Sequence, residues 1–174
     1  MTDRELFEAI KSAALLRGEF TLRSGRKSKY YLDKYLFEAQ PVILKELGQR
    51  FARCAGPQTT RIAGAELGGV ALAAAASMAG GLPFVIVRNA KKGYGTQKMY
   101  EGQLESGDHV LLVEDIATTG GQVLEAAKTI AEAGAIVDKI VAVIDRQEGA
   151  RENIESAGYV FESLMTKADL GITD

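Results

Sequence analysis

Short runs of consecutive apolar residues, each followed by a turn and a helix-like segment, constrain the fold of this chain more than any other feature. The runs are unbroken at 84–87 and 110–113, and apolar residues also predominate in the strands expected at 61–63, 136–144 and 159–161. The helix-like segments lie at 70–78, 123–133 and near 152–157. Strands buried on both faces carry such unbroken apolar runs, whereas strands with one wet face alternate apolar and polar residues. The pattern therefore predicts an α/β fold with a central, mostly parallel, twisted sheet flanked by helices.

The first 55 residues precede this pattern and have a different character. The segment Thr2-Asp3-Arg4-Glu5 is a capping box that starts a helix, which we expect to end at Gly18. Residues 20–37 are basic, aromatic and extended in character, with a turn at 24–25. Pro41 then begins a second helix, whose core positions are expected to be Leu44, Leu47 and Phe51.

Composition excludes several classes of function. The chain has 174 residues, which fits a single domain spanning 1–174, and its formal net charge is −2. A chain this close to neutrality has no overall attraction to nucleic acid or to an anionic membrane. The most apolar stretch, 62–78, is interrupted by Glu66 and three glycines, so we expect no membrane span. The acidic start lacks an apolar signal core, which favours a cytoplasmic protein.

The counts of cysteine and histidine restrict the chemistry further. Cys54 and His109 are the only residues of their types, so an internal disulfide and a Cys/His zinc site are both excluded. Cys54 is expected to be buried on the second helix. His109 precedes a strand and is expected to face solvent.

The segment 110–122, with the sequence VLLVEDIATTGGQ, carries the strongest functional signal. A buried strand brings Glu114 and Asp115 to the edge of the sheet where ligands bind. The small residues of 117–121 then open a helix, whose free N–H groups and about half a positive charge favour an anion. This combination predicts a phosphate-binding turn with two acids beside it.

The acids narrow the choice of ligand, because two carboxylates would repel a bare anion. A ribose 5-phosphate satisfies both features, with its phosphate in the turn and its hydroxyls on Glu114 and Asp115. The P-loop pattern is absent, and the glycines near 93–95 lack the third glycine of a dinucleotide fingerprint. The alternative is a surface turn with solvated acids and helix-capping threonines, which the combined order of strand, acids, threonines and glycines disfavours.

The segment resembles the ribose-phosphate motif of the type I phosphoribosyltransferases, and the chain resembles the orotate phosphoribosyltransferase family over nearly its whole length. Four further segments carry the resemblance: 20–28 is similar to the orotate-binding segment, 64–69 to the pyrophosphate loop, 88–95 with 101–102 to the mobile catalytic loop, and 145–149 to the arginine segment. The resemblance implies a type I phosphoribosyltransferase fold, in which residues 1–40 form a small hood that contributes to the base site.

The resemblance also implies the reaction and its partners. Ribose 5-phosphate would pass from 5-phosphoribosyl 1-diphosphate to orotate, giving orotidine 5′-monophosphate and pyrophosphate. Mg²⁺ is the implied cofactor, held mainly by the substrate, with no direct protein ligation required, although Glu114 and Asp115 could share it. A homodimer is implied, in which the mobile loop completes the partner's site.

Site residues follow position by position from the same resemblance. The implied catalytic residues are Arg88, Lys92 and Asp115. Contacts to 5-phosphoribosyl 1-diphosphate would come from Arg88, Lys91, Lys92, Tyr94, Glu114, Asp115, Ile116, Ala117, Thr118, Thr119, Gly120, Gly121 and Gln122. Orotate would contact Arg23, Thr118 and Arg146, the last as a planar fork on its carboxylate.

Some positions depart from the family pattern. Asn89 stands where many members have lysine, and Gly68 stands where some have it. Tyr94 stands where many have histidine, and Arg23 replaces a lysine that is common in the orotate segment. These departures leave two alternatives open: transfer to another base, and a regulator on this fold that binds phosphoribosyl ligands without turnover. The basic and aromatic residues between 23 and 35 motivate the regulator, which would also bind nucleic acid.

Overall fold

The protein is described here from a computed structural model, which defines residues 1–21, 25, 27–90 and 98–172. Six strands form the central sheet in the order β5-β4-β3-β6-β7-β8. Their bounds are Arg61–Ala65 (β3), Phe84–Val87 (β4), Tyr100–Glu101 (β5), His109–Ala117 (β6), Ile136–Asp145 (β7) and Phe161–Thr166 (β8). Every pairing is parallel except that of the edge strand β5 with β4. The predicted α/β fold with a mostly parallel sheet is confirmed.

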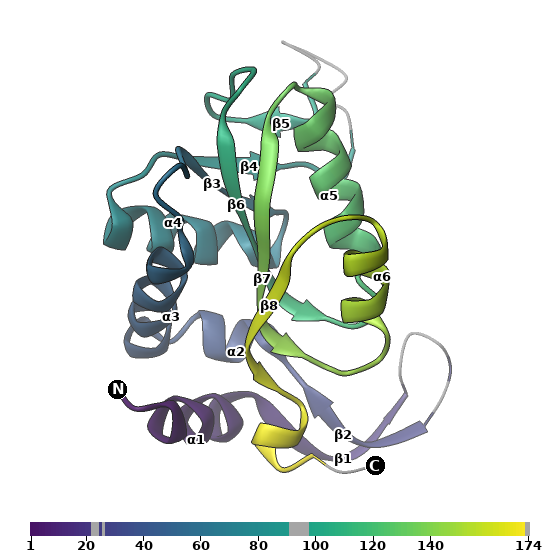
Figure 1. The fold of residues 1–174 in the computed structure, drawn as a ribbon. Helices are drawn as coiled ribbons and strands as arrows, with labels where there is room; N and C mark the ends of the chain where they lie inside the picture. Colours follow the sequence, from purple (N-terminus) through teal and green to yellow (C-terminus); the bar gives the residue numbers. More distant parts are fainter. Residues whose placement is uncertain (22–24, 26, 91–97, 173–174) are drawn as a thin grey trace.

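Helices cover both faces of this sheet (Figure 1). On one face lie α1 (Asp3–Ala14), α2 (Lys34–Glu38), α3 (Pro41–Cys54) and α4 (Gly68–Gly80), and on the other lie α5 (Gly121–Glu132) and α6 (Ala150–Ser156). Strand β6 alternates between the two cores: Leu111 and Val113 pack with the first set of helices, whereas Val110 and Leu112 pack with the second. The alternation is reversed at the end of the strand, where Ile116 packs against the first core and Ala117 lies in the second.

The N-terminal segment forms a helix and a hairpin, and two expectations about it were wrong. The capping box at Thr2 is present, but α1 ends at Ala14 rather than at Gly18. Gly18 instead lies inside β1 (Leu15–Thr21), which pairs antiparallel with β2 (Lys27–Leu32) and shifts register between Arg17 and Phe20. The backbone after Ala14 exchanges helical hydrogen bonds for pairing with β2, a tertiary choice that local spacing does not reveal.

The second correction concerns residues 34–37, the end of the segment that was expected to be extended. They lie in α2, because the Asp33 side chain accepts a hydrogen bond from the Tyr35 N–H at 3.2 Å and so caps a helical turn. The predicted turn at 24–25 lies outside the described residues except for Gly25, which has a φ of +82°. Figure 1 shows this hairpin beneath the carboxyl ends of β6 and β7.

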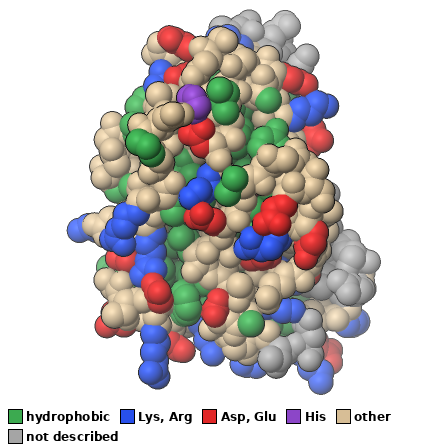
Figure 2. Space-filling model, in the orientation of Figure 1, with side chains coloured by type: hydrophobic (Ala, Val, Ile, Leu, Met, Phe, Trp, Pro, Cys, Tyr) green, Lys and Arg blue, Asp and Glu red, His purple; other side chains and the backbone are tan. Residues whose placement is uncertain are grey.

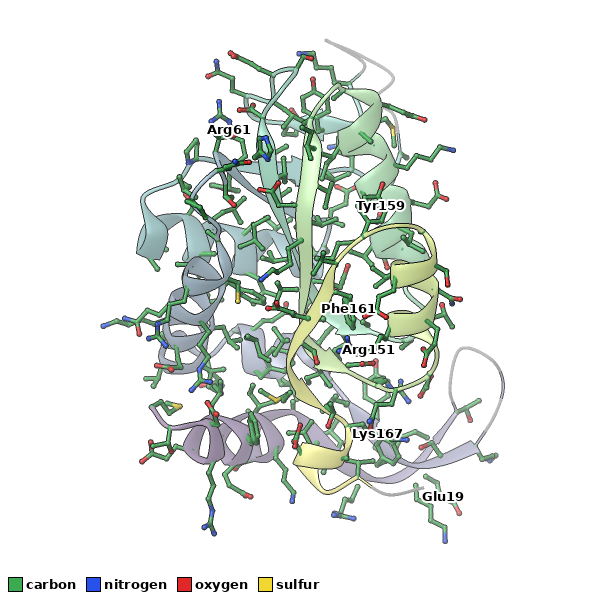
Figure 3. All side chains as sticks on the ribbon, viewed as in Figure 1. Glu19, Arg61, Arg151, Tyr159, Phe161 and Lys167 are labelled. Carbon is green, nitrogen blue, oxygen red and sulfur yellow. The ribbon has the colours of Figure 1, made fainter. Side chains whose placement is uncertain are left out.

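The remaining elements differ from expectation mainly at their ends. Helix α3 has the predicted start and core residues, with Leu47 and Phe51 buried and Leu44 partly buried. Strand β5 was not predicted, and β8 begins at Phe161 instead of 159. Figure 3 shows Arg151 of α6 beside Phe161, with the guanidinium 5.1 Å from the ring centroid. That contact helps α6 to cover β8.

Surface features agree with the near-neutral charge. Acidic and basic side chains are interspersed over the face drawn in Figure 2, where the single histidine lies beside acidic atoms. His109 is partly exposed, and its Nδ1 lies 2.6 Å from Oδ1 of Asp138. Cys54, expected to be buried, is half-buried because α3 ends there at the surface. No helix in the described ranges has the length and apolar character to cross a membrane.

Candidate active site

The candidate site lies where the parallel strands end. Strands β3, β4, β6 and β7 run in the same direction, so the loops that follow them meet at one edge of the sheet. An open cavity of about 190 Å³ occurs there, and its lining residues are Glu114 and 116–123. The structure therefore brings together the turn and one of its two acids.

The turn before α5 is built to leave backbone N–H groups free. Gly120 has a φ of +80°, a left-handed conformation that suits glycine, and no side chain caps the helix. Asn153 of α6 supports the turn from behind by donating its Nδ2 to the Thr119 carbonyl at 2.8 Å. Uncapped amides at the start of a twelve-residue helix are the donors that bind an anion.

The two acids of β6 do not share this cavity. Successive side chains of a strand point to opposite faces, so Glu114 faces the turn together with Val110 and Leu112, while Asp115 faces α2 and α4. The two side chains nevertheless remain close enough to interact directly, so the expectation that both carboxylates line one sugar site stays a prediction.

Asp115 sits in a tight, charged environment. Its side chain is 2% exposed, and its Oδ2 lies 2.6 Å from Nζ of Lys34, the first residue of α2. Oδ1 accepts a hydrogen bond from the N–H of Ile116. A Cβ added to Gly68 would lie 1.5 Å from Oδ2, so only glycine fits at that position while Asp115 keeps this orientation.

Charge and burial shift several pKa values here. Burial, and then the charge of Asp115, raise the pKa of Glu114 well above its ordinary value, and the same two causes raise the pKa of Glu38 to about 8. Burial alone would lower the pKa of Lys34, but the hydrogen bond to Asp115 and its charge outweigh burial and raise it. Within the described residues, Glu114 Oε2 and Glu38 Oε1 are buried without a hydrogen-bond partner.

Lys34 and Glu38 were missed by sequence reasoning. Residues 20–37 were expected to be extended, which would not place Lys34 on a helix facing Asp115, and Glu38 lies just beyond that segment. Only the cap at Asp33 signals the short helix, and nothing in the local sequence shows which strand that helix faces.

A second network joins the loop after β3 to the start of the 88–102 loop. The Asn89 N–H donates to Oε1 of Glu66 at 2.7 Å, and its Nδ2 donates to the Glu66 carbonyl at 3.0 Å. Nε2 of Gln122 reaches the same carbonyl at 3.2 Å. Glu66 thereby ties together the loop at 64–69, the base of the next loop and the first turn of α5.

Two of the predicted cations lie at this edge. Arg88 directly follows β4, with its Nη1 3.6 Å from Oε1 of Glu101. Arg146 follows β7, its N–H bonds to the Ala117 carbonyl at 2.9 Å, and its side chain pairs with Glu148 at 2.9 Å. Arg146 thus lies directly beside the turn that precedes α5. The other predicted cations Arg23, Lys91 and Lys92, together with Tyr94, lie outside the described residues.

Comparison with known proteins gives a consistent result. A family model described as the phosphoribosyl transferase domain matches residues 43–168. An orotate phosphoribosyltransferase of Methanocella arvoryzae is 48% identical over 169 residues, covering 97% of each chain, and one of Natronomonas pharaonis is 43% identical over 171 residues, covering 98% of each.

Solved structures agree with these relatives. A Mycobacterium tuberculosis orotate phosphoribosyltransferase in complex with Fe(III) dicitrate superposes with a TM-score of 0.90 at 32% identity, covering 98% of this chain and 100% of that one. The same protein in complex with 5-phospho-alpha-D-ribosyl 1-diphosphate superposes with a TM-score of 0.84 at 32% identity and the same coverage.

Proposed function

This chain belongs to the phosphoribosyl transferase family, and from that premise we propose that it is an orotate phosphoribosyltransferase. It transfers ribose 5-phosphate from 5-phosphoribosyl 1-diphosphate to orotate, which yields orotidine 5′-monophosphate and pyrophosphate in the biosynthesis of UMP. Residues 1–174 act as one phosphoribosyltransferase domain, with 1–40 as the hood over the base site.

The observation that carries this proposal is the uncapped turn at the end of β6. The free amides of Thr118, Thr119, Gly120, Gly121 and Gln122 bind the 5-phosphate, with Ile116 and Ala117 forming the approach to the turn. Glu114, which lines the same cavity, accepts hydrogen bonds from the ribose hydroxyls. In the absence of ligand, its buried Oε2 has no hydrogen-bond partner in the described part of the chain, so it is available for this contact.

Cations on the loop after β4 favour bond cleavage. Negative charge grows on the diphosphate as the bond to ribose C1 breaks, so a cation placed there stabilises the transition state more than the ground state. Arg88 is the described candidate, and its long contact with Glu101 leaves the guanidinium able to reorient. Lys91, Lys92 and Tyr94 join it by resemblance to the family, with Lys92 as the principal catalytic cation.

The base is held on the opposite side of the turn. Arg146 is fixed through its backbone to Ala117, so its guanidinium can leave Glu148 and bind the orotate carboxylate as a planar fork. Thr118 offers a hydroxyl from the turn, and Arg23 of the hood completes the set. Asp115 is retained as a catalytic residue, although its carboxylate faces Lys34.

Mg²⁺ is the proposed cofactor. The described residues contain no group of three or more metal-binding side chains, so the protein alone offers no complete site. The buried oxygens of Glu114 and Asp115 are the hard donors that Mg²⁺ prefers, and they could supplement the oxygens of the substrate. When bound, Mg²⁺ supplies charge neutralisation at the diphosphate.

The assembly and location of the protein are part of the same proposal. We expect a cytoplasmic homodimer in which the 88–102 loop reaches the partner's site, with no nucleic acid or membrane partner. Sedimentation of the purified protein tests the dimer, because a monomer with full activity would contradict it.

The decisive experiment follows the absorbance of orotate with 5-phosphoribosyl 1-diphosphate and Mg²⁺. We expect consumption that depends on all three components and releases pyrophosphate. Hypoxanthine, adenine and uracil replace orotate in parallel reactions, and a preference for one of them would show another base specificity. Absence of turnover with every base, together with binding of the diphosphate sugar, would indicate the non-catalytic regulator instead.

A further inference from the structure

A lysine from the N-terminal segment contacts the acid at the tip of β6. Lys34 begins α2 and places its ammonium 2.6 Å from Oδ2 of Asp115. The lysine side chain is 31% exposed and the aspartate side chain 2% exposed, so the pair joins a partly open cation to a buried anion. A buried carboxylate that loses its cation must be protonated or must move.

The surrounding packing is adapted to this pair. Gly68, at the start of α4, leaves the space that Asp115 Oδ2 fills, since a Cβ at this position would lie 1.5 Å from Oδ2 and 3.2 Å from the Lys34 ammonium. Lys34 therefore reaches the acid over a position that has no side chain. Glu38, one helical turn after Lys34, is buried on the same side and is influenced by the charge of Asp115.

Asp115 links Lys34 to the phosphate turn, the segment 117–121 that precedes α5. While Oδ2 is paired with Lys34, Oδ1 accepts the N–H of Ile116, the residue that begins the lining of the cavity after Glu114. The Asp115 N–H in turn donates to Oε1 of Glu114 at 3.2 Å. Rotation of the Asp115 carboxylate would therefore release the N–H of Ile116, at the approach to the turn, and would move the side-chain charge that acts on Glu114.

We propose that Lys34 is a positioning residue for the phosphoribosyl site: its ammonium holds the Asp115 carboxylate against Gly68, and Asp115 in turn orients Glu114 and the start of the phosphate turn. This inference rests on the proposed function for the identity of the ligand, 5-phosphoribosyl 1-diphosphate. Lys34 also offsets one of three carboxyls, those of Glu38, Glu114 and Asp115, beside a site that must accept an anion.

The test measures binding separately from turnover. Calorimetry gives the Kd of 5-phosphoribosyl 1-diphosphate with Mg²⁺ and no base, and orotate turnover gives KM and kcat. Lys34→Met removes the charge and keeps the apolar stem, and Lys34→Arg keeps the charge. Lys45→Met is the matched control, because Lys45 is exposed on α3 away from Asp115. Thermal unfolding checks that each variant is folded.

We expect Lys34→Met to raise the Kd and the KM for the diphosphate sugar by roughly 10–100-fold, as loss of a residue that orients a ligand-binding group commonly does. Lys34→Arg should recover most of the affinity, and Lys45→Met should match the wild type. In the double variant, Lys34→Met should raise the Kd by less than about threefold over that of Asp115→Asn alone, because the two residues act through one contact.

Three results would overturn the proposal: a folded Lys34→Met protein with wild-type Kd, an Arg variant as impaired as the Met variant, or full multiplication of the two effects in the double variant. Should Lys34→Met fail to fold, the Kd of Gly68→Ala for the diphosphate sugar replaces it as the test. The added methyl group must displace the Asp115 carboxylate, so it should raise this Kd similarly. A wild-type protein that binds the diphosphate sugar but consumes no orotate would refute the proposed function while leaving the role of Lys34 to be decided by the Kd values.

Discussion

Replacing Glu38 by glutamine should stabilise the protein above neutral pH. Glu38 is 5% exposed, and burial together with the charge of Asp115 raises its pKa from 4.5 to about 8. The unfolded chain releases this proton near pH 4.5, whereas the folded protein keeps it until about pH 8. Folding therefore binds a proton throughout this window, and its free energy becomes less favourable as the pH rises from 4.5 to 8.

The size of the effect follows from the shift. A difference of about 3.5 pH units corresponds, at about 1.4 kcal/mol per unit, to a ceiling of about 5 kcal/mol. Helix α2 has only five residues and exposes Tyr35 and Leu36 to solvent, so local relaxation and water entry reduce the penalty. We expect Glu38→Gln to gain about 2–3 kcal/mol relative to the wild type between pH 5 and pH 9.

Urea unfolding at intervals of pH, followed by circular dichroism, measures this difference. Glu46→Gln on α3 is the matched control with the opposite sign. Burial alone would raise the pKa of Glu46, but the hydrogen bond from Arg50 and the charges of the N-terminus and Arg50 outweigh it and lower the pKa. Its stabilising contribution is present at neutral pH and is lost as the pH falls through the folded pKa, so Glu46→Gln should be destabilising at pH 7 and approach the wild type in acid.

A constant difference between Glu38→Gln and the wild type from pH 5 to pH 9 would refute the reasoning, because it would show that Glu38 titrates alike in both states. A loss of stability that grows with pH would refute it more strongly. That result would mean that Glu38 is ionised in the folded protein and stabilised by Lys34.

Three further predictions concern the scaffold. Gly120→Ala places a side chain at φ +80° and should cost about 1–2 kcal/mol in urea unfolding and weaken inorganic phosphate binding in calorimetry; unchanged phosphate affinity would contradict the role of the turn. Gly64→Ala puts a Cβ 2.1 Å from the Gly69 carbonyl, where β3 meets α4, and should cost about 3 kcal/mol, seen as a lower Tm. Arg50→Ala breaks ion pairs with Glu46 and with Asp3 of α1 and should cost about 2 kcal/mol, less at high salt; a loss independent of salt would exclude an ionic cause.

The sequence was most informative where local pattern and burial coincide. Unbroken apolar runs such as 84–87 and 110–113 predicted buried parallel strands, and the structure confirms them. A strand that is apolar on both faces is kept from water only inside a sheet that helices cover on both sides. The turn from Ala117 to Gly121 was equally clear, since small residues between a buried strand and a helix have one common arrangement. Resemblance to a family then added the reaction, which composition and spacing do not specify.

The sequence was less informative where backbone pairing competes with local preference. Gly18 was expected to end a helix, yet the chain leaves the helix after Ala14 to pair with β2. Residues 34–37 were expected to be extended, yet they lie in the helix α2. Strand β5 has only two residues and exists because its backbone pairs with β4. Such choices depend on partners far along the chain, which local propensity does not identify.

The site shows the same division. The sequence alone determined that Glu114 and Asp115 end a buried strand next to an anion-binding turn, because that order of residues is a property of the chain. Tertiary structure alone decided which groups surround the two carboxylates: Glu114 lines the cavity beside the turn, and Lys34 and Glu38 lie beside Asp115. The physical reason is that a charge responds to whatever lies within a few ångströms, and about eighty residues of chain separate α2 from the end of β6.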